Sequence, residues 1–166
     1  MKPKEIKKLT AFFFEIGNLR KVIRAHQQTL LSFDLSDTIA SHSFRVVFIG
    51  YFLAKEIGAD VDRVVKMCLL HDLEETRSSD HNWVHKRYVK VFEDEIRRDQ
   101  LKNLPNSEEL IELSKEYEAK DWLKGIHTVN QQEKMMSTKL AREVAVEAKK
   151  QAPSFWWENL WTAKRR

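Results

Sequence analysis

The run from Met67 to Glu75 places a histidine and an aspartate directly after an apolar segment. An imidazole nitrogen and a carboxylate oxygen are both ligands for divalent transition metals. A buried carboxylate without a partner is strongly disfavoured, and a bound cation would supply that partner. Neighbouring helix residues point about 100° apart, so His71 and Asp72 can bind the same ion only if that ion lies between the directions of their two side chains. The competing interpretation is a helix-end histidine beside a capping aspartate, which is the commoner case for an isolated dipeptide.

A second histidine favours the metal hypothesis. His42 falls early in an amphipathic segment, residues 36–57, and residues 58–60 then form a short turn before the helix that leads to His71. Consecutive helices joined by a short turn pack antiparallel. We therefore expect His42 and His71 at the same end of a helical hairpin, where two ligands of one metal must lie.

The rest of the chain also has helical periodicity. With four glycines and three prolines in 166 residues, and apolar residues at helical spacing, the chain is predicted to be all-α. Helices are expected over residues 4–25, over 36–57 with Ser36 or Asp37 as the cap, over 60–71 capped by Asp60, and over 84–101, 107–118 and 119–146, the last with a polar break at 127–132. A final short helix begins at Pro153 and carries Phe155, Trp156, Trp157, Leu160 and Trp161.

Composition limits the class of protein. Hydrophobic residues make up 42% and charged residues 33% of the chain, which fits one globular domain over residues 1–166. The formal net charge of +4 suits a phosphate-bearing small molecule as well as a nucleic acid. The C-terminal aromatic cluster lacks interleaved basic residues, so no nucleic-acid partner is expected. The single Cys68 excludes an internal disulfide and favours a cytoplasmic location, and no apolar run is long enough for a membrane span.

Three separated motifs together resemble the HD-domain metal phosphohydrolases, and within them the small all-helical group that includes the 5′-deoxynucleotidases. The motifs are Asp-Thr-Ile-Ala-Ser-His-Ser-Phe-Arg-Val at 37–46, His-Asp-Leu-Glu-Glu at 71–75, and Asp80. Their order and spacing agree from about Leu9 to Glu118. The resemblance implies a single HD-type helical bundle that forms a homodimer, with a C-terminal helical lid at about 137–163.

The resemblance also implies roles for the matched residues. His42, His71 and Asp72 would be metal ligands. Glu75 would handle the attacking water or the leaving group, and Asp80 would lie beside the scissile phosphate.

Arg24, just after the first predicted helix, matches an arginine that holds substrate in the family. The family usually has Gly-Trp shortly after that arginine, whereas this chain reads Ala-His-Gln-Gln at 25–28, so contacts to base or sugar are expected to differ. Lys86 or Arg87 could also balance phosphate charge.

The fourth metal ligand of the family is an aspartate on a later helix, after a Glu-Tyr-Glu region. Glu-Tyr-Glu is found at 116–118, and Asp121 with Leu123 can be read as that ligand setting. In a second register, Asp-Trp-Leu-Lys at 121–124 matches a segment further downstream, and the ligand-bearing helix is then absent from this chain. We favour the second register, under which the site has three protein ligands.

These observations predict a metal-dependent phosphohydrolase, a 5′-nucleotidase acting on (deoxy)nucleoside 5′-monophosphates. The ligand types do not distinguish Mn²⁺, Co²⁺, Fe²⁺ and Zn²⁺, and Mg²⁺ is possible. The alternative is a non-catalytic HD-domain module that binds a nucleotide or a protein with an incomplete metal site; a third interpretation is phosphodiesterase or triphosphohydrolase activity. If the helix before His71 continues, Glu75 shares the face of His71, while Glu74 should point towards solvent.

Overall fold

A computed structural model describes residues 1–25, 37–119 and 138–150, and the structural statements below concern these residues. Its helices are α1 (Pro3–Ile16), the 3₁₀ helix η1 (Gly17–Lys21), α3 (Ile39–Glu56), α4 (Val61–Leu70), α5 (Glu75–Ser78), α6 (Trp83–Tyr88), α7 (Glu93–Leu101), α8 (Ser107–Ala119) and α10 (Lys139–Lys150). The all-α prediction is confirmed: the only β pairing in the described part is an isolated bridge between Ile23 and Thr38.

The chain divides into two compact units, Met1–Ala119 and Lys120–Arg166. The first unit contains every predicted site residue except Asp121. Within the second unit, α10 is an amphipathic helix, and the aromatic cluster predicted after Pro153 lies outside the described residues. Among the helices described, none is long and apolar enough to cross a membrane.

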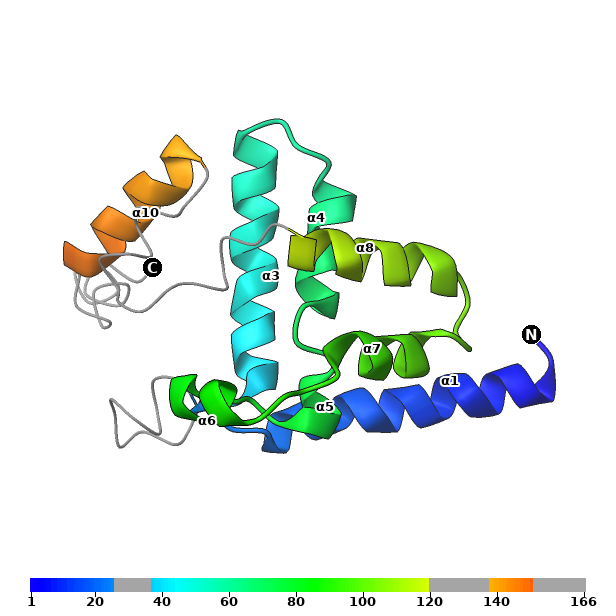
Figure 1. The fold of residues 1–166 in the computed structure, drawn as a ribbon. Coiled ribbons are helices and arrows are strands. Elements are labelled where there is room, and N and C mark those ends of the chain that lie inside the picture. Colours follow the sequence, from blue (N-terminus) through cyan, green and yellow to red (C-terminus); the bar gives the residue numbers. More distant parts are fainter. Residues whose placement is uncertain (26–36, 120–137, 151–166) are drawn as a thin grey trace, which may run out of the picture. The chain divides into compact units, whose positions relative to one another are not determined.

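Helices α3 and α4 pack against each other as the predicted antiparallel hairpin (Figure 1). The start of α3 and the end of α4 therefore lie at the same end of the pair. Thr38 caps α3 by accepting a hydrogen bond from the Ser41 amide, which corrects the expected cap at Ser36 or Asp37. Asp60 caps α4 as expected, accepting from the Arg63 amide at 3.0 Å.

Gly50 allows this hairpin to pack closely. A Cβ atom built on Gly50 would lie 2.6 Å from Sγ of Cys68 and 3.3 Å from Cγ1 of Val64, both on α4. These separations are shorter than van der Waals contact, so a side chain at residue 50 would push the helices apart. The close approach brings the start of α3 near the end of α4.

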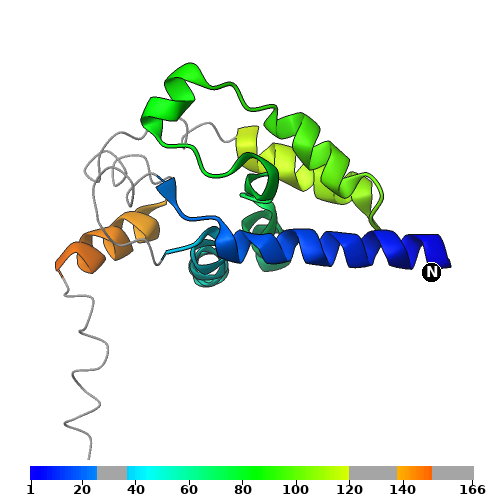
Figure 2. The ribbon, with the colours of Figure 1, turned by 90° about the horizontal axis from the view of Figure 1, so that it is seen from below.

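The first helix is shorter than predicted. It ends at Ile16 rather than continuing to Ala25, and after η1 the chain runs alongside the start of α3 (Figure 2). Two backbone hydrogen bonds hold it there, from the Arg24 amide to the Asp37 carbonyl at 3.1 Å and from the Ile39 amide to the Val22 carbonyl at 2.8 Å. Glycine favours helix ends, and the new backbone pairing replaces the helical hydrogen bonds that are lost.

The helix predicted over 84–101 is two helices, α6 and α7. Residues 89–92, Val-Lys-Val-Phe, connect them, and Val89 has an extended backbone. β-branched and aromatic residues favour such a conformation over helix, which explains the interruption. Asn82 begins α6 by accepting hydrogen bonds from the amides of Val84 and His85, both at 3.0 Å.

The core lies between η1, the α3–α4 hairpin, α7 and α8. Its buried residues are Leu19, Ile39, Met67, Leu70, Leu73, Leu101 and Leu113. Leu70 and Leu73 flank the His-Asp pair in sequence, so the turn that carries this pair is anchored in the core on both sides.

Candidate metal centre

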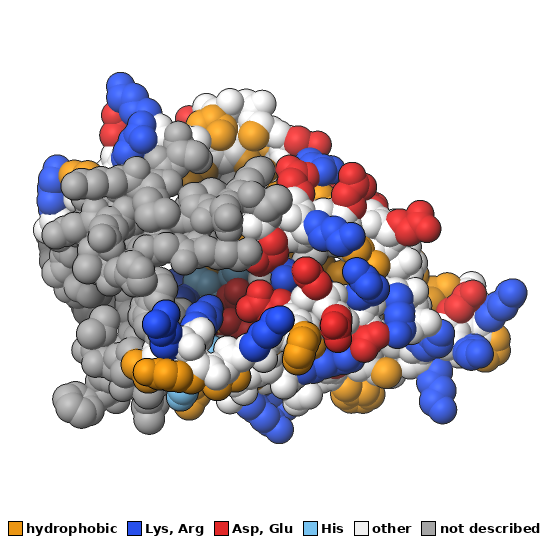
Figure 3. Space-filling view, viewed as in Figure 1, with side chains coloured by type: hydrophobic (Ala, Val, Ile, Leu, Met, Phe, Trp, Pro, Cys, Tyr) orange, Lys and Arg blue, Asp and Glu red, His pale blue; other side chains and the backbone are white. Residues whose placement is uncertain are grey.

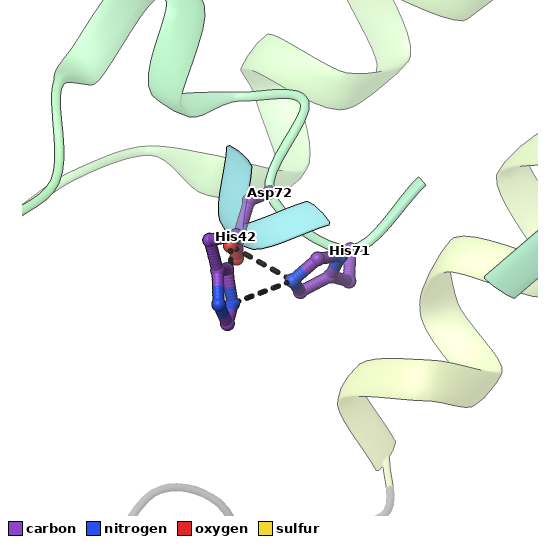
Figure 4. Close-up of side chains that lie close together, drawn as sticks. All are labelled: His42, His71 and Asp72. Atoms are coloured by element: carbon purple, nitrogen blue, oxygen red, sulfur yellow. Dashed lines mark hydrogen bonds and ion pairs between the residues drawn. The ribbon is translucent and has the colours of Figure 1, made fainter. Parts of the chain in front are cut away.

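The structure brings His42, His71 and Asp72 together, and one ligand atom from each lies within 4.8 Å of the others (Figure 4). Nε2 of His42 is 3.2 Å from Nε2 of His71 and 3.5 Å from Oδ2 of Asp72. Nε2 of His71 is 2.8 Å from the same Oδ2 atom. His42 comes from the first turn of α3, and the other two residues follow the end of α4.

His71 is held in one orientation by its surroundings. Its Nδ1–H donates to the carbonyl oxygen of Cys68 at 2.7 Å, and its ring lies 5.6 Å from that of Tyr117, centroid to centroid. An imidazole ring that donates its Nδ1–H to a carbonyl keeps Nε2 free to bind a metal, and metal-bound histidines commonly have this arrangement. Burial disfavours the charged ring, but Asp72 and the Cys68 carbonyl outweigh it and raise the pKa of His71.

His42 remains uncharged at neutral pH. Burial, followed by the positive charge of Arg24, lowers its pKa from 6.5 to about 4. Nη1 of Arg24 donates to Nδ1 of His42. An arginine can only donate hydrogen bonds, so Nδ1 is the acceptor here and the ring proton lies on Nε2.

Asp72 completes a set of groups that a cation fits. Burial opposes its ionisation, but His71, then His42 and Arg24, outweigh burial and lower the pKa of Asp72, so it is an anion. Two imidazole nitrogens and a carboxylate oxygen converge on one point from a partly buried position. This donor set suits a divalent transition metal, and it fits the cation that the sequence predicted.

Two more carboxyl groups lie next to this cluster. Burial, then the negative charges of Asp72 and Asp80, raise the pKa of Glu75 from 4.5 to about 10, and the charge of Lys86 opposes the rise. Oε2 of Glu75 is buried without a hydrogen-bond partner. Asp80 is buried and accepts a hydrogen bond from the Ala25 amide at 2.8 Å, which ties the end of the α5 segment to the residue after Arg24.

Glu74 does not point to solvent, so that expectation was wrong. It is 6% exposed and its Oε1 lies 4.0 Å from Nη1 of Arg97, which is itself 5% exposed. The same Nη1 is 3.2 Å from Oε1 of Glu118. The expectation assumed a continuous helix, whereas α4 ends at Leu70 and a turn separates it from α5. The periodicity of a helix therefore does not assign the directions of Glu74 and Glu75.

Sequence reasoning missed a polar network that supports the turn from behind. Glu15 on α1 accepts hydrogen bonds from Nε of Arg77 at 2.5 Å and from Nε2 of Gln100 at 2.8 Å. Gln100 is buried and also donates to the Leu73 carbonyl and to Oγ1 of Thr76. The network joins α1, α5 and α7, which are far apart in sequence, so no local pattern could reveal it.

The structure leaves one predicted ligand untested. Asp121 lies outside the described residues, so both registers for the fourth ligand stay open. Lys86 and Arg87 lie in the last turn of α6 and are exposed.

Two solved structures resemble the fold of this chain. The chain resembles the crystal structure of a genomics target, with a TM-score of 0.64, 24% identity, and coverage of 90% of this chain and 99% of that one. It also resembles a conserved hypothetical protein from Pyrococcus furiosus, with a TM-score of 0.57, 22% identity, and coverage of 86% and 99%. At these identities the likenesses show the fold.

The search of curated proteins found no match. A family model described as HD domain matches residues 16–158, which include His42, His71 and Asp72. HD domains bind divalent metals and are generally metal-dependent hydrolases. The chain therefore belongs to the HD-domain family.

Proposed function

We propose that this protein is a metal-dependent phosphomonoesterase, specifically a 5′-nucleotidase acting on (deoxy)nucleoside 5′-monophosphates. The observation that carries the proposal is the convergence of His42, His71 and Asp72 beside the buried, unpartnered carboxyl group of Glu75. The three residues would hold a divalent cation, and Asp121, which lies outside the described residues, is the candidate fourth ligand. Such a cation, when bound, polarises a phosphate oxygen and lowers the pKa of bound water.

Glu75 is suited to act as a general acid. With its pKa raised to about 10 it keeps its proton at neutral pH, and it can give that proton to the leaving alkoxide of the ester. Asp80 lies close enough to Glu75 to raise its pKa, which supports a place for Asp80 beside the same phosphate.

Arg24 would bind the phosphate. For Nε2 of His42 to act as a ligand, the ring proton must move to Nδ1, and Nδ1 then no longer accepts from Arg24. The guanidinium needs a new acceptor at that point, and a phosphate oxygen provides one in a charge-assisted hydrogen bond. The contact between Arg24 and His42 thus supports a link between ligand formation at His42 and phosphate binding by Arg24.

A second candidate is a non-catalytic HD module that binds a nucleotide or a protein. The observation that favours it is that, within the described residues, the metal-ligating group has three members. Three ligands leave positions for water and substrate, but they hold the cation less tightly than four.

One experiment separates the two candidates. The purified chain is analysed for bound metal, then incubated with Mn²⁺, Co²⁺, Fe²⁺, Zn²⁺ or Mg²⁺ and a panel of nucleoside 5′-monophosphates, cyclic nucleotides and triphosphates. We expect metal uptake and release of phosphate from the monophosphates, with both lost in a variant that combines His71→Ala and Asp72→Ala. Metal uptake without turnover of any panel member would favour the binding module, and absence of metal uptake would refute the metal centre itself.

We also propose that the chain forms a homodimer, as the resemblance implies. Sedimentation at micromolar concentration measures it directly, and a purely monomeric boundary would contradict it.

A further inference from the structure

Helix α6 carries basic side chains that form no ion pair with the residues that the structure describes. Its last turn contains His85, Lys86 and Arg87, all exposed, and within the described part of the chain neither Lys86 nor Arg87 forms an ion pair. Several cations on other helices are paired, for example Arg45 with Asp37, Arg63 with Glu116, and Arg77 with Glu15. Lys4 and Lys7 on α1 are also exposed and form no ion pair with the described residues. Lys86 differs from them because its charge acts on the buried carboxyl group of Glu75, so the end of α6 offers an anionic ligand a place near the metal centre.

The helix is fixed next to the metal centre. Asp80, three residues before α6, is bound to the backbone amide of Ala25, and Asn82, which caps α6, is 3% exposed. The charge of Lys86 acts on the buried carboxyl group of Glu75. In Figure 3, histidine and acidic side chains of the described residues are visible behind basic side chains that lie over α6.

His81 adds an unsatisfied polar atom beside these cations. Its ring lies 5.7 Å from the ring of His85, and its Nδ1 is buried without a hydrogen-bond partner. Acidic residues that follow in the chain do not neutralise the group, because Glu93 and Asp94 are directed to Arg97, at 3.8 and 3.6 Å.

We propose that the basic end of α6 binds a second phosphate group of the substrate, so that the preferred substrate is a nucleoside 5′-phosphate with a further phosphate on the sugar, such as a nucleoside 3′,5′-bisphosphate. This inference rests on the proposed 5′-nucleotidase function. A nucleoside 5′-monophosphate has one phosphate, which Arg24 and the metal centre already take. The charges of Lys86 and Arg87 then have no partner among the described residues, whereas a second phosphate gives them one.

The test compares two substrates in three proteins. The substrates are adenosine 5′-monophosphate and adenosine 3′,5′-bisphosphate, and the readout is the ratio of their kcat/KM values. The proteins are the unaltered chain, a variant that combines Lys86→Ala and Arg87→Ala, and a control that combines Lys4→Ala and Lys7→Ala on α1, where the lysines are also exposed.

We expect the unaltered chain and the α1 control to prefer the bisphosphate by at least about 10-fold, the effect of one charge-assisted hydrogen bond. The α6 variant should bring this ratio close to one, mainly through KM. Raising the salt concentration should shrink the preference in the unaltered chain, because the charges are exposed. An unaltered chain without preference, or an α6 variant that retains it, would overturn the proposal.

Binding distinguishes a failure of this inference from a failure of the proposed function. Calorimetric titration of the metal-loaded chain with both nucleotides needs no turnover. Tighter binding of the bisphosphate that is lost in the α6 variant supports the second phosphate site even if neither nucleotide is hydrolysed. Turnover of both nucleotides with equal affinity supports the proposed function and refutes the site on α6.

Discussion

The substitution Gly50→Ala tests whether the close contact between α3 and α4 determines stability and the metal centre. The added methyl carbon would lie 2.6 Å from Sγ of Cys68, about 1 Å inside normal contact. Overpacking of this kind destabilises by about 1–3 kcal/mol. Alanine also gains about 1 kcal/mol over glycine in a helix interior. The net loss is therefore about 0–2 kcal/mol, or up to about 8 °C in Tm for a domain of this size.

A double-mutant cycle isolates the contact from the helix propensity. In a Cys68→Ala background the sulfur atom is gone, and Gly50→Ala should then be stabilising by up to about 1 kcal/mol. The expected coupling between residues 50 and 68 is about 1–3 kcal/mol, measured by denaturant unfolding of the four proteins. Gly17→Ala is the matched control, because a Cβ atom there meets nothing within 4 Å.

Metal affinity provides a second readout of the same substitution. His42 lies two helical turns before Gly50 on α3, and His71 follows α4, so separating the helices should move the two ligands apart. We expect weaker metal binding by Gly50→Ala and recovery in the double variant. Equal effects of Gly50→Ala in both backgrounds would refute the close contact and, with it, the account of how the hairpin places the ligands.

The other predictions concern three carboxyl groups. Glu75→Gln should keep the metal and lower turnover by roughly 10²- to 10⁴-fold, the range for a general acid, and a rate within a few-fold of the unaltered enzyme would exclude that role. Glu74→Gln should instead change the pH dependence of unfolding of the metal-free chain. Burial raises the pKa of Glu74 from 4.5 to about 8 in the folded chain. The contribution of protonated Glu74 to the free energy of unfolding is therefore complete below about pH 4.5, the pKa of the group in the unfolded chain, and is lost as the pH rises through 8. Glu75, with its pKa raised to about 10, gives a decline of the same sign, so the variant should lose stability less steeply than the unaltered chain between about pH 4.5 and 8, and an unchanged slope would contradict the burial of Glu74. The effect of Glu15 on stability has the opposite dependence on pH. Burial raises its pKa, but hydrogen bonds from Arg77 and Gln100 outweigh burial and lower it. The contribution of ionised Glu15 to stability is therefore present above about pH 4.5 and is lost on further acidification. Glu15→Gln should be less stable than the unaltered chain at pH 7, and the difference should shrink as the pH falls below about 4.5, as measured by thermal unfolding.

The sequence alone determined the helical class and the meeting of His42 with His71. Both follow from local rules: apolar periodicity predicts the helices, and a short turn at 58–60 requires antiparallel packing. The prediction that two ligands lie at the same end of one hairpin therefore does not depend on the rest of the fold. The metal-ligand types were likewise readable from the His-Asp pair and His42, and the family resemblance from three separated motifs taken together.

Only the tertiary structure decided what surrounds these ligands. Arg24 contacts His42 because the chain after η1 pairs with the start of α3, and Asp80 reaches Ala25 across more than fifty residues of sequence. Glu74 is buried because Arg97, on another helix, faces it. Such contacts depend on where packing places distant segments, and helical periodicity carries no information about that once α4 ends at Leu70 and the chain turns.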